Sequence, residues 1–511
     1  MSNFGAGVVS RLAGQSGLVM LGNLFTLLVG FPFQVYLANK LGAHQLGVFG
    51  IFEVLAQTAG AVFSLGLGFT LIRYLPQHVG QGWHRHARNL LSAAFAVTAC
   101  AGIVAAVMVA TGRPLLLAWM PELGPYADLF ILAAIMTWMG MMIWLSQHAL
   151  RAFFDVRRMI AMSSFLQLLV KVLITIVLLW LGWELMGYMV AVVVSAAVAL
   201  TGMLLGIRAH VKRLERSTEA ISRETETSWL AYSRTMYGTY LLGVMSPPVE
   251  RFLLAGVIDL ASVGVLMAVR QLQMFLQVPL TIIATGVSTL LVAAKTRNDH
   301  EEVRQLYHTA TDWGCRLGFP LLLFLLFFGG EILAIYGPAF ARDGQLPLAL
   351  LVGGLVLGLM VGPVDTMLNM LGHERTLFRF SVVSNVIALG CLLVLVPFLG
   401  LVGAVIGTTL SMLYMNLAAL RTIKKELGIP WWSARYARLV MPIGVLAGVL
   451  VMVKLAGVLA SAWLLAAFLP LSYGIFFGIY LCAGLTNEDR EILALLQGKI
   501  MAPMRRASSG V

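Results

Sequence analysis

The chain has 511 residues, of which 59% are hydrophobic and only 11% are charged, and its formal net charge is +12. A typical soluble domain has about 25% charged residues, so this composition excludes an ordinary soluble enzyme and predicts an integral membrane protein. A basic excess of this size could also indicate a nucleic-acid-binding protein, but the placement of the basic residues argues against that class.

Apolar segments long enough to cross a bilayer recur from one end of the chain to the other. A transmembrane helix needs about 20 mostly apolar residues, and about 14 segments meet that requirement. They lie near 17–38, 46–72, 90–110, 126–147, 161–182, 187–207, 232–256, 262–292, 312–335, 346–371, 377–398, 401–420, 437–457 and 461–483. The predicted fold is therefore an all-α polytopic membrane protein.

The first apolar segment is predicted to stay in the membrane as an anchor. The N-terminus is not strongly basic, and the segment has span length rather than the shorter core of a cleaved signal peptide. The four cysteines also lie in apolar segments, at Cys100, Cys315, Cys391 and Cys482. We interpret them as small buried side chains, and we predict neither a disulfide framework nor a metal site from them.

Lysines and arginines gather on one side of the predicted membrane. When the N-terminus and every second loop are assigned to one side, that side holds most of the 35 basic residues. The opposite side holds only Lys40, Arg113 and Arg342. Because loops rich in basic residues remain in the cytoplasm, both termini are predicted to be cytoplasmic, and the positive charge is explained by topology and lipid contact.

Six basic residues lie within or beside the predicted spans. They are Lys171, Arg234, Arg251, Arg270, Arg316 and Lys454. We expect Arg234, Arg316 and Lys454 to reach the interface by snorkelling, because they lie near predicted helix ends. Lys171 and Arg270 lie deeper, and Arg251 is ambiguous.

Two pairs of segments repeat at nearly the same spacing. Residues 37–49 align with 254–266 at an offset of 217, and residues 150–167 align with 368–385 at an offset of 218. The identical pairs in the first alignment are Leu37 with Leu254, Ala38 with Ala255, Gly47 with Gly264 and Val48 with Val265. Internal repeats in a polytopic protein are typical of transporters. Six crossings separate the copies, so the repeats are predicted to be parallel.

The repeats predict two six-helix lobes. The predicted boundaries are 1–208 for the first lobe, 209–230 for a cytoplasmic linker, 231–422 for the second lobe, 423–484 for two extra helices and 485–511 for a cytoplasmic tail. The linker carries charges of both signs and has no apolar periodicity. Trp431 and Trp432 precede the extra helices and are typical of interfacial anchors.

Prolines occur at a similar depth in the first helix of each lobe. Pro32 in the first lobe, and Pro247 and Pro248 in the second, are predicted to kink their helices. Interrupted helices in corresponding positions point to a transport pathway. The repeat offset also matches two polar pairs, Gln34 with Arg251 and Glu53 with Arg270.

No enzymatic motif is found. The only Gly-Lys pair, at Gly498, lacks the upstream glycine of a Walker A sequence, GxSxG is absent, and HERT at 373–376 is not HExxH. No histidine lies in the middle of a span, and His78, His84 and His86 share a loop that we interpret as solvated rather than metal-binding. The chain is predicted not to be an enzyme and to need no cofactor or metal. Short outward loops disfavour a polysaccharide polymerase or ligase.

Charges within the spans are the remaining candidates for function, because an ionisable group inside a bilayer is costly. Lys171 lies about 15 Å from either end of its helix, and it forms either a structural charge pair or part of a cavity. The same alternatives hold for Glu53 and Arg270, which occupy equivalent places in the two repeats.

Glu250 and Arg251 are neighbours that project about 100° apart on a helix. They cannot pair well with each other, so one can pair locally while the other faces a cavity. Asp365, in the tenth span, is expected to make a structural hydrogen bond rather than to bind an ion.

Residues 36–76, YLANKLGAHQLGVFGIFEVLAQTAGAVFSLGLGFTLIRYLP, resemble the first-to-second helix signature of the bacterial polysaccharide transporter family. This family contains the O-antigen flippases of the multidrug/oligosaccharidyl-lipid/polysaccharide (MOP) exporter superfamily. Residues 249–269, VERFLLAGVIDLASVGVLMAV, are similar to its seventh-helix motif. Glu250 stands where the family more often has Asp, and Val265-Leu266 replaces the usual Leu-Tyr.

The resemblance implies a V-shaped pair of six-helix lobes, alternating access, and a cationic cavity lined chiefly by the first, second, seventh and eighth helices. Family members move undecaprenyl-pyrophosphate-linked oligosaccharides from the inner to the outer leaflet of the bacterial cytoplasmic membrane. The candidate cavity residues are Arg270, Arg251, Glu53, Gln34 and Lys171, with Glu250 and Asp365 as gating or structural charges. We further predict that, if Glu53 and Arg270 face each other across the cavity in one access state, they form a gate that an anionic headgroup competes to open.

Three functions remain open at this point. A lipid-linked oligosaccharide flippase would use arginine to bind an anionic pyrophosphate through bidentate hydrogen bonds. A cation-coupled exporter of drugs or small solutes from the same superfamily would favour acidic cavity residues. A non-transporting scaffold for polysaccharide assembly would need neither kinks nor buried charges. The deep charges are basic by a small margin, which favours the flippase. The predicted partners are the lipid-linked substrate, membrane lipids and polysaccharide polymerase or assembly proteins, without nucleic acid.

Overall fold

The computed structural model describes residues 2–214, 223–244, 246–297, 299–430, 432–457 and 461–482. The described residues form helices with short connections, and no strand occurs among them. This confirms the predicted all-α class. Trp431, the tail at 485–511 and part of the linker at 209–230 lie outside the described residues.

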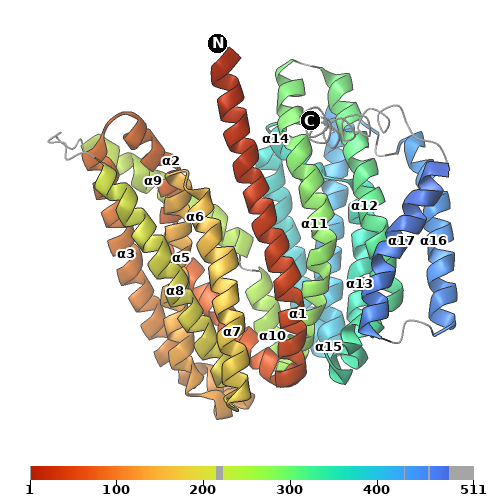
Figure 1. Cartoon of the computed structure of the whole chain (residues 1–511), viewed down its shortest axis with the longest axis horizontal. Coiled ribbons are helices and arrows are strands. Elements are labelled where there is room, and N and C mark those ends of the chain that lie inside the picture. The colour runs from red at the N-terminus through yellow and green to blue at the C-terminus, as the bar shows by residue number, and fades with distance from the viewer. Residues whose placement is uncertain are drawn as a thin grey trace, which may run out of the picture. The chain divides into compact units, whose positions relative to one another are not determined.

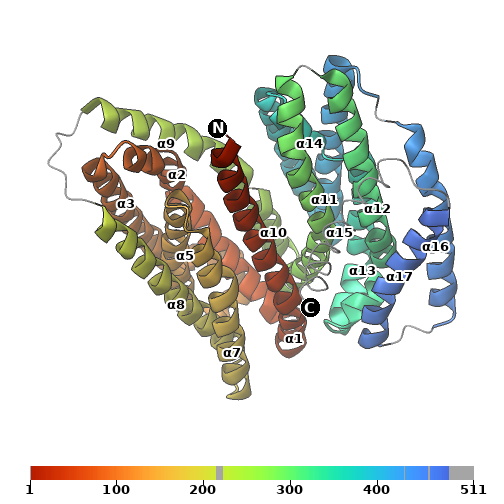
Figure 2. The same ribbon diagram turned by 45° about the horizontal axis from the view of Figure 1, so that its top comes forward.

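The helices can be followed along the chain by colour in Figures 1 and 2. The first part contains α1 (Ser2–Phe63), α2 (Leu67–Gly80), α3 (His84–Thr111), α4 (Arg113–Trp119), the 3₁₀ helix η1 (Pro121–Tyr126), α5 (Leu129–Ala152), α6 (Val156–Ile160), the π-helix η2 (Ala161–Leu166), α7 (Gln167–Trp180) and α8 (Glu184–Arg213). The second part contains α9 (Arg223–Val244), α10 (Ser246–Val257), α11 (Leu260–Thr296), α12 (His300–Ala334), α13 (Pro338–Val361), α14 (Val364–Met370), α15 (Glu374–Leu427), the 3₁₀ helix η3 (Ala434–Tyr436), α16 (Ala437–Leu455) and α17 (Ala462–Cys482).

Eleven helical segments of the described residues are long and apolar enough to cross a membrane. Two of them, Leu18–Phe63 in α1 and Glu374–Glu426 in α15, have 46 and 53 residues. At 1.5 Å per residue each is about 70 Å or longer, which is more than twice the hydrocarbon thickness of about 30 Å. Each helix is broken inside by one glycine, Gly42 (φ 72°) or Gly400 (φ 55°). Each is therefore long enough for two crossings, and the total of about 14 stays a prediction.

Many large apolar side chains are exposed on these helices. Trp180, Phe398 and Trp463 are among the most exposed of them. Continuous apolar surfaces of this kind mark contact with a membrane or a partner, and span-length apolar helices identify the membrane. The chain is a multi-pass membrane protein.

The chain forms two compact units. Unit 1 comprises Met1–Gln271, Leu333–Pro347 and Ser381–Ser411, and unit 2 comprises Leu272–Ile332, Leu348–Phe380 and Met412–Val511. Helices α11, α12, α13 and α15 each supply residues to both units. The lobe boundaries expected from the repeats, at 1–208 and 231–422, remain predictions.

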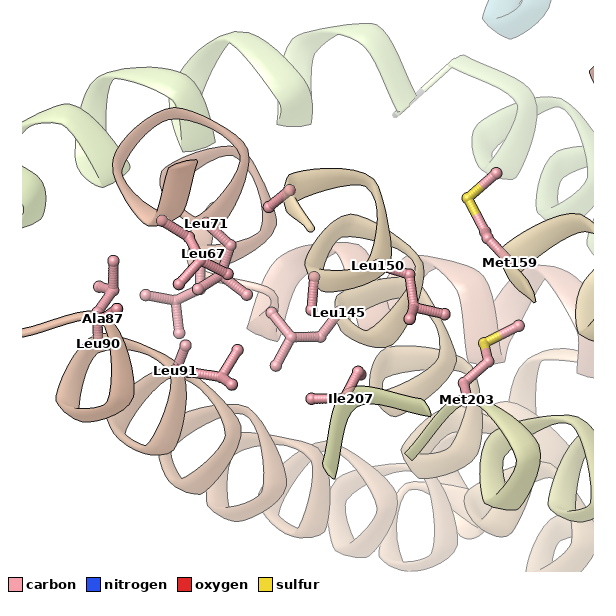
Figure 3. Close-up of a cluster of buried hydrophobic side chains, with 14 of the residues drawn as sticks. Leu67, Leu71, Ala87, Leu90, Leu91, Leu145, Leu150, Met159, Met203 and Ile207 are labelled. Atoms are coloured by element: carbon pink, nitrogen blue, oxygen red, sulfur yellow. The ribbon is translucent and has the colours of Figure 1, made fainter. Parts of the chain in front are cut away.

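The core of unit 1 is built from small and aliphatic side chains on five helices, α2, α3, α5, α6 and α8. Figure 3 shows Leu71, Leu91 and Leu145 within this cluster, which also includes Met203 and Ile207 of α8. In unit 2, Tyr307, Met367 and Ile423 belong to a second buried cluster. Each cluster fixes how the helices of its own unit pack.

Turns at equivalent repeat positions have the same backbone pattern. Phe154 (φ 57°) follows α5 and Gly372 (φ 85°) follows α14, and they lie 218 residues apart. In both turns the left-handed residue donates to the carbonyl three residues earlier, and the next residue donates to the carbonyl five residues before it. Gly182 (φ 80°) and Gly400 (φ 55°) form another left-handed pair at the same spacing. The backbone thus agrees with the repeat offset read from the sequence.

The three prolines differ in how they affect their helices. Pro247 and Pro248 lie in the first turn of α10, which begins at Ser246 shortly after α9 ends at Val244. Proline is tolerated there because the first N–H groups of a helix have no intrahelical partner. Pro32 lies inside α1, which keeps helical dihedral angles through it and breaks ten residues later at Gly42.

Candidate functional site

Two ion pairs join three helices of unit 1. Arg251 of α10 donates from Nη1 to Oε2 of Glu53 on α1 at 2.9 Å. Arg270 of α11 donates from Nη2 to both carboxylate oxygens of Glu250 on α10, at 2.7 and 2.9 Å. Because Glu250 and Arg251 point in different directions from α10, one neighbour pairs with α1 and the other pairs with α11.

The four side chains differ in burial. The Glu250 side chain is only 5% exposed, whereas Arg251, Arg270 and Glu53 are 21%, 27% and 30% exposed. A buried carboxylate that loses its cation is strongly destabilising. Arg270 therefore compensates a buried charge, while both members of the Glu53–Arg251 pair remain accessible to another polar group.

Thr408 of α15 also binds Arg270. Its hydroxyl accepts a hydrogen bond from Arg270 Nη2 at 3.1 Å and lies within hydrogen-bond distance of the carbonyls of Ala404 and Val405. The guanidinium thus connects α10, α11 and α15 within unit 1. Nothing in the sequence marks Thr408, because it lies in an apolar segment rich in small residues and its repeat counterpart is Val190.

Lys171 of α7 lies beside the first ion pair. Its ammonium is 5.8 Å from the ring centroid of Phe33, and it interacts electrostatically with Glu53. The ring of Tyr188 packs against Phe33, with centroids 6.2 Å apart. The Lys171 ammonium is therefore a second positive charge near Glu53, next to the rings of Phe33 and Tyr188.

Two other predicted residues are placed differently. Gln34 is half-buried in α1, and among the described residues no hydrogen bond joins it to the charged cluster. Asp365 lies in the first turn of α14, in unit 2, and is exposed. Their assigned roles therefore remain predictions.

The expected pairing of Glu53 with Arg270 does not occur in this conformation. Each residue pairs instead with a member of the Glu250–Arg251 dipeptide. The sequence indicates that Glu53 and Arg270 lie deep in the membrane. Which residues they pair with depends on the rotation of α10 about its own axis, which decides whether Glu250 or Arg251 faces α1. The dipeptide supplies both signs of charge, so it compensates both helices.

Arg316 corrects another expectation. It was predicted to snorkel from a helix end, but its side chain is 3% exposed and pairs with Asp312 in unit 2. Its guanidinium also lies 4.2 Å from the ring centroid of Tyr480 on α17. The helix begins at His300, well before the apolar run begins, so Arg316 lies in its middle. The Asp–Arg spacing of four residues was the overlooked signal.

The extra helices α16 and α17 dock on α12 through further polar contacts. Tyr473 donates to the carbonyl of Leu317 at 2.7 Å, and Lys454 donates to the carbonyl of Phe327 and pairs with Glu331. Lys454, for which snorkelling to the interface was expected, lies in the last turn of α16. Arg234, for which snorkelling was also expected, is exposed on α9.

The cluster around Arg251 can bind an anion by exchange. Two arginines and one lysine face two glutamates, which leaves one net positive charge. A guanidinium forms bidentate hydrogen bonds with carboxylate or phosphate oxygens alike. No group of three or more His, Cys, Asp or Glu residues suitable for a metal occurs in the described part of the chain.

A family profile described as "Polysaccharide biosynthesis protein" matches residues 13–289. This range includes both ion pairs, Glu53–Arg251 and Glu250–Arg270. The chain belongs to this family. The match confirms the resemblance seen in residues 36–76 and 249–269. A comparison with curated proteins finds no match.

Solved structures of the MOP superfamily share the fold. The lipid II flippase MurJ, in an inward closed conformation, matches with a TM-score of 0.65 at 12% identity, covering 91% of this chain and 97% of MurJ. An inward-facing multidrug resistance MATE transporter matches with a TM-score of 0.63 at 16% identity, covering 79% of this chain and 94% of that one. A MOP superfamily transporter from Pyrococcus furiosus matches with a TM-score of 0.53 at 16% identity, covering 82% and 95%. The chain therefore has a MATE- and MurJ-like fold.

Proposed function

We propose that this protein is a flippase that moves an anionic lipid-linked oligosaccharide across the bacterial inner membrane by alternating access, for the synthesis of cell-surface polysaccharide. The observation that carries the proposal is the Glu53–Arg251 ion pair. It lies within the membrane helices, and both of its side chains are partly exposed. Membership of the polysaccharide biosynthesis family supports a glycan-related substrate. A transporter rather than an enzyme also fits the fold shared with MATE and MurJ.

Exchange of partners gives the proposed binding step. A pyrophosphate headgroup supplies oxygens to Arg251 and takes the place of the Glu53 carboxylate. The released Glu53 then pairs with Lys171, which already interacts with it. No buried charge is left without a partner during the exchange, so the desolvation cost of an isolated charge is avoided.

Arg270 has a different role in this mechanism. It stays with the buried Glu250 and with Thr408, and so fixes α10 against α11 and α15. Arg251 is attached to the same helix one residue further on. The Glu250–Arg270 pair therefore positions the guanidinium that binds substrate.

The proposed orientation places both termini in the cytoplasm, since the basic loops lie on that side. The lipid carrier would enter from the inner leaflet with its headgroup in the cavity and its tail in the bilayer. A polymerase or other assembly protein would then use the glycan on the outer side.

One alternative function has a specific observation in its favour. The fold also matches a multidrug resistance MATE transporter, and Glu53 and Glu250 could serve a cation-coupled exporter of drugs or small solutes. The two functions predict opposite effects at position 251. Loss of Arg251 should abolish binding of an anionic lipid-linked substrate, whereas an exporter of cationic solutes should retain or gain activity.

Reconstitution tests the proposal directly. Purified protein in proteoliposomes should carry a fluorescent undecaprenyl-pyrophosphate-linked oligosaccharide across the bilayer, and Arg251→Ala should reduce the rate to that of empty liposomes. A cationic dye loaded into the same vesicles serves as the competing substrate. Dye transport without oligosaccharide transport would reject the flippase in favour of the exporter, and activity with neither would favour a scaffold.

A further inference from the structure

A cavity of about 360 Å³ lies in unit 2, between α12 and the segment that connects α15 to α16. One wall is the face of α12 formed by Glu301, Arg304, Gln305 and His308, which share one side of the helix at spacings of three and four residues. The other wall is formed by Pro430, Trp432, Ser433 and Arg435. With about 30 Å³ per water in the liquid, the space holds about 12 waters, several times the volume of one phosphate group.

Contacts behind the cavity fix its basic and aromatic groups. His308 is buried and its Nδ1 lies 2.9 Å from the hydroxyl of Tyr436. Arg435 donates from Nη1 to the hydroxyl of Thr309 at 3.4 Å. Tyr436 also packs edge-on against Trp432, with ring centroids 5.9 Å apart. Arg435 and Tyr436 are therefore both held against α12.

The carboxylate of Glu301 occupies the place that an external anion would take. It accepts a hydrogen bond from Gln305 at 3.2 Å and lies 3.6 Å from Nη1 of Arg304. Both Glu301 and Arg304 are more than half exposed, so this ion pair contributes little stability. With Arg304 and Arg435 against Glu301, the lining has one net positive charge when His308 is neutral.

The position along the helices indicates where the anion comes from. Trp432 is exposed beside the cavity, and tryptophan and tyrosine are enriched at the level of lipid headgroups. The flanking segments carry further basic residues, namely Lys295, Arg297, Arg421, Lys424, Lys425 and Arg438. Clusters of basic residues next to membrane spans attract anionic lipids.

We propose that this cavity binds the phosphate headgroup of an anionic phospholipid. The phosphate oxygens contact Arg304 and Arg435, and the glycerol part lies against Trp432. Glu301 turns outward to solvent when the lipid binds. The site is separate from the Arg251 cluster in unit 1, and its occupancy does not depend on what that cluster transports.

The test uses the full-length protein purified in mild detergent, with bound lipids counted by native mass spectrometry during titration with phosphatidylglycerol. The double variant R304Q/R435Q should bind one phosphatidylglycerol fewer, or bind that lipid about tenfold more weakly, since a charge-assisted hydrogen bond is lost at each position. E301Q should bind it more tightly, because the competing carboxylate is removed. R375Q serves as the control, because Arg375 is exposed in unit 2 outside this cavity.

Two added arms separate the possible sources of the phosphate. Phosphatidylcholine should bind without any difference between wild type and R304Q/R435Q, and inorganic phosphate should compete only weakly with the lipid. Equal binding of phosphatidylglycerol by wild type and R304Q/R435Q would overturn the proposal. Inorganic phosphate binding as tightly as the lipid would also overturn it, in favour of a soluble anion. If R304Q/R435Q does not fold, the E301Q variant decides the matter. An E301Q variant that binds phosphatidylglycerol no more tightly than the wild type would then reject the proposed site.

Discussion

Gly47 of α1 and Gly264 of α11 bring two helix backbones into direct contact within unit 1. A Cβ added to Gly47 would lie 1.7 Å from the carbonyl oxygen of Leu260, and a Cβ added to Gly264 would lie 2.0 Å from the carbonyl oxygen of Ala43. The contact is reciprocal, because Leu260 follows Ala43 by the same 217 residues that separate the glycines. Gly47 contacts Leu260, and their repeat counterparts, Gly264 and Ala43, contact each other in the same way. Such a reciprocal contact is the mark of a local twofold axis.

The neighbouring residues follow the same relation. A Cβ on Gly50 would lie 2.6 Å from Sδ of Met267, its own repeat counterpart. The break of α1 at Gly42 corresponds to Asp259, in the connection between α10 and α11. Close packing through small residues is a common way for membrane helices to associate, and here it joins the two copies of the repeated element.

Replacing either glycine of this crossing by alanine should destabilise the protein. The added methyl group would meet backbone atoms, which cannot move aside as a flexible side chain can, so Gly47→Ala and Gly264→Ala should each cost roughly 1–3 kcal/mol or more. Gly30→Ala is the matched control, because Gly30 lies in the same α1 helix and a Cβ there meets nothing within 4 Å. Thermal unfolding in detergent should show lower midpoints for the first two variants and an unchanged or slightly higher one for the control. Equal midpoints for all three would show that the crossing is not tight in solution.

The repeat and the class of fold could be predicted because both depend on local sequence. Gly47 and Gly264, and the turn residues Phe154 and Gly372, are matched at fixed offsets, and the same offsets reappear in the backbone. Apolar length similarly identified most of the spans. A left-handed turn or a close crossing constrains a few adjacent residues, so it leaves a trace in the sequence.

The partners of the charged residues could not be predicted in the same way. The sequence places Glu53 and Arg270 deep in the membrane and leaves the depth of Arg251 ambiguous. Coulomb attraction does not depend on sequence order, so either arginine could pair with Glu53. The choice depends on the rotation and the start of α10, which begins at the two prolines. Arg316 is placed near a helix end by the sequence because the predicted span begins only at 312, whereas α12 begins at His300 with polar first turns.

The two arginines of the candidate site should differ in their effects on stability. Arg270→Ala leaves the buried Glu250 carboxylate without its cation, which should cost about 3–5 kcal/mol. Arg251→Ala leaves the more exposed Glu53, which Lys171 can still compensate, so stability should change little while flipping is lost. Thermal unfolding and membrane abundance would be compared with those of Arg375→Ala, a change at an exposed position. Equal stability of Arg270→Ala and Arg251→Ala would show that Arg270 is not needed to compensate Glu250.

The buried Asp312–Arg316 pair should hold α17 in unit 2. Arg316→Ala should lower the free energy of unfolding by about 3–5 kcal/mol, because Asp312 remains buried. Tyr480→Leu removes the cation–π contact with Arg316 and leaves the Asp312–Arg316 pair in place, so it should cost less, about 0.5–2 kcal/mol for that contact. Lys454→Met provides a comparison, since its ion pair with Glu331 is partly exposed and weak. Thermal unfolding should rank the losses in this order, and a larger loss for Lys454→Met would contradict it.

Cysteine labelling in intact spheroplasts checks the proposed orientation. In a background without the four native cysteines, Arg342→Cys should react with an impermeant maleimide added from outside, because Arg342 is highly exposed near the start of α13, in a sparsely basic segment that the proposed orientation places outside. Arg375→Cys, also exposed, should react only after the membrane is permeabilised. The opposite pattern would place the termini outside and reverse the proposed direction of substrate entry.

Charge reversal distinguishes the observed partner of Glu53 from the one expected on sequence grounds. Either single change, Glu53→Arg or Arg251→Glu, places like charges opposite each other near Lys171 or Glu250, so both should lose most activity. The combined E53R/R251E variant restores opposite charges across the observed 2.9 Å contact. Residues in direct contact typically couple by about 0.5–3 kcal/mol, so the combination should fold better than either single variant and recover part of the flipping rate.

The second combination, E53R/R270E, should recover neither property. It places a second carboxylate beside the buried carboxylate of Glu250, and two like charges in that site cannot both remain ionised without a large cost. Unfolding midpoints and rates of oligosaccharide flipping would be measured for both combinations and all three single variants at matched protein levels. If E53R/R270E recovers more activity than E53R/R251E, then Arg270 is the functional partner of Glu53 in the transport cycle, and the pairing seen in this conformation is not the one that the substrate displaces.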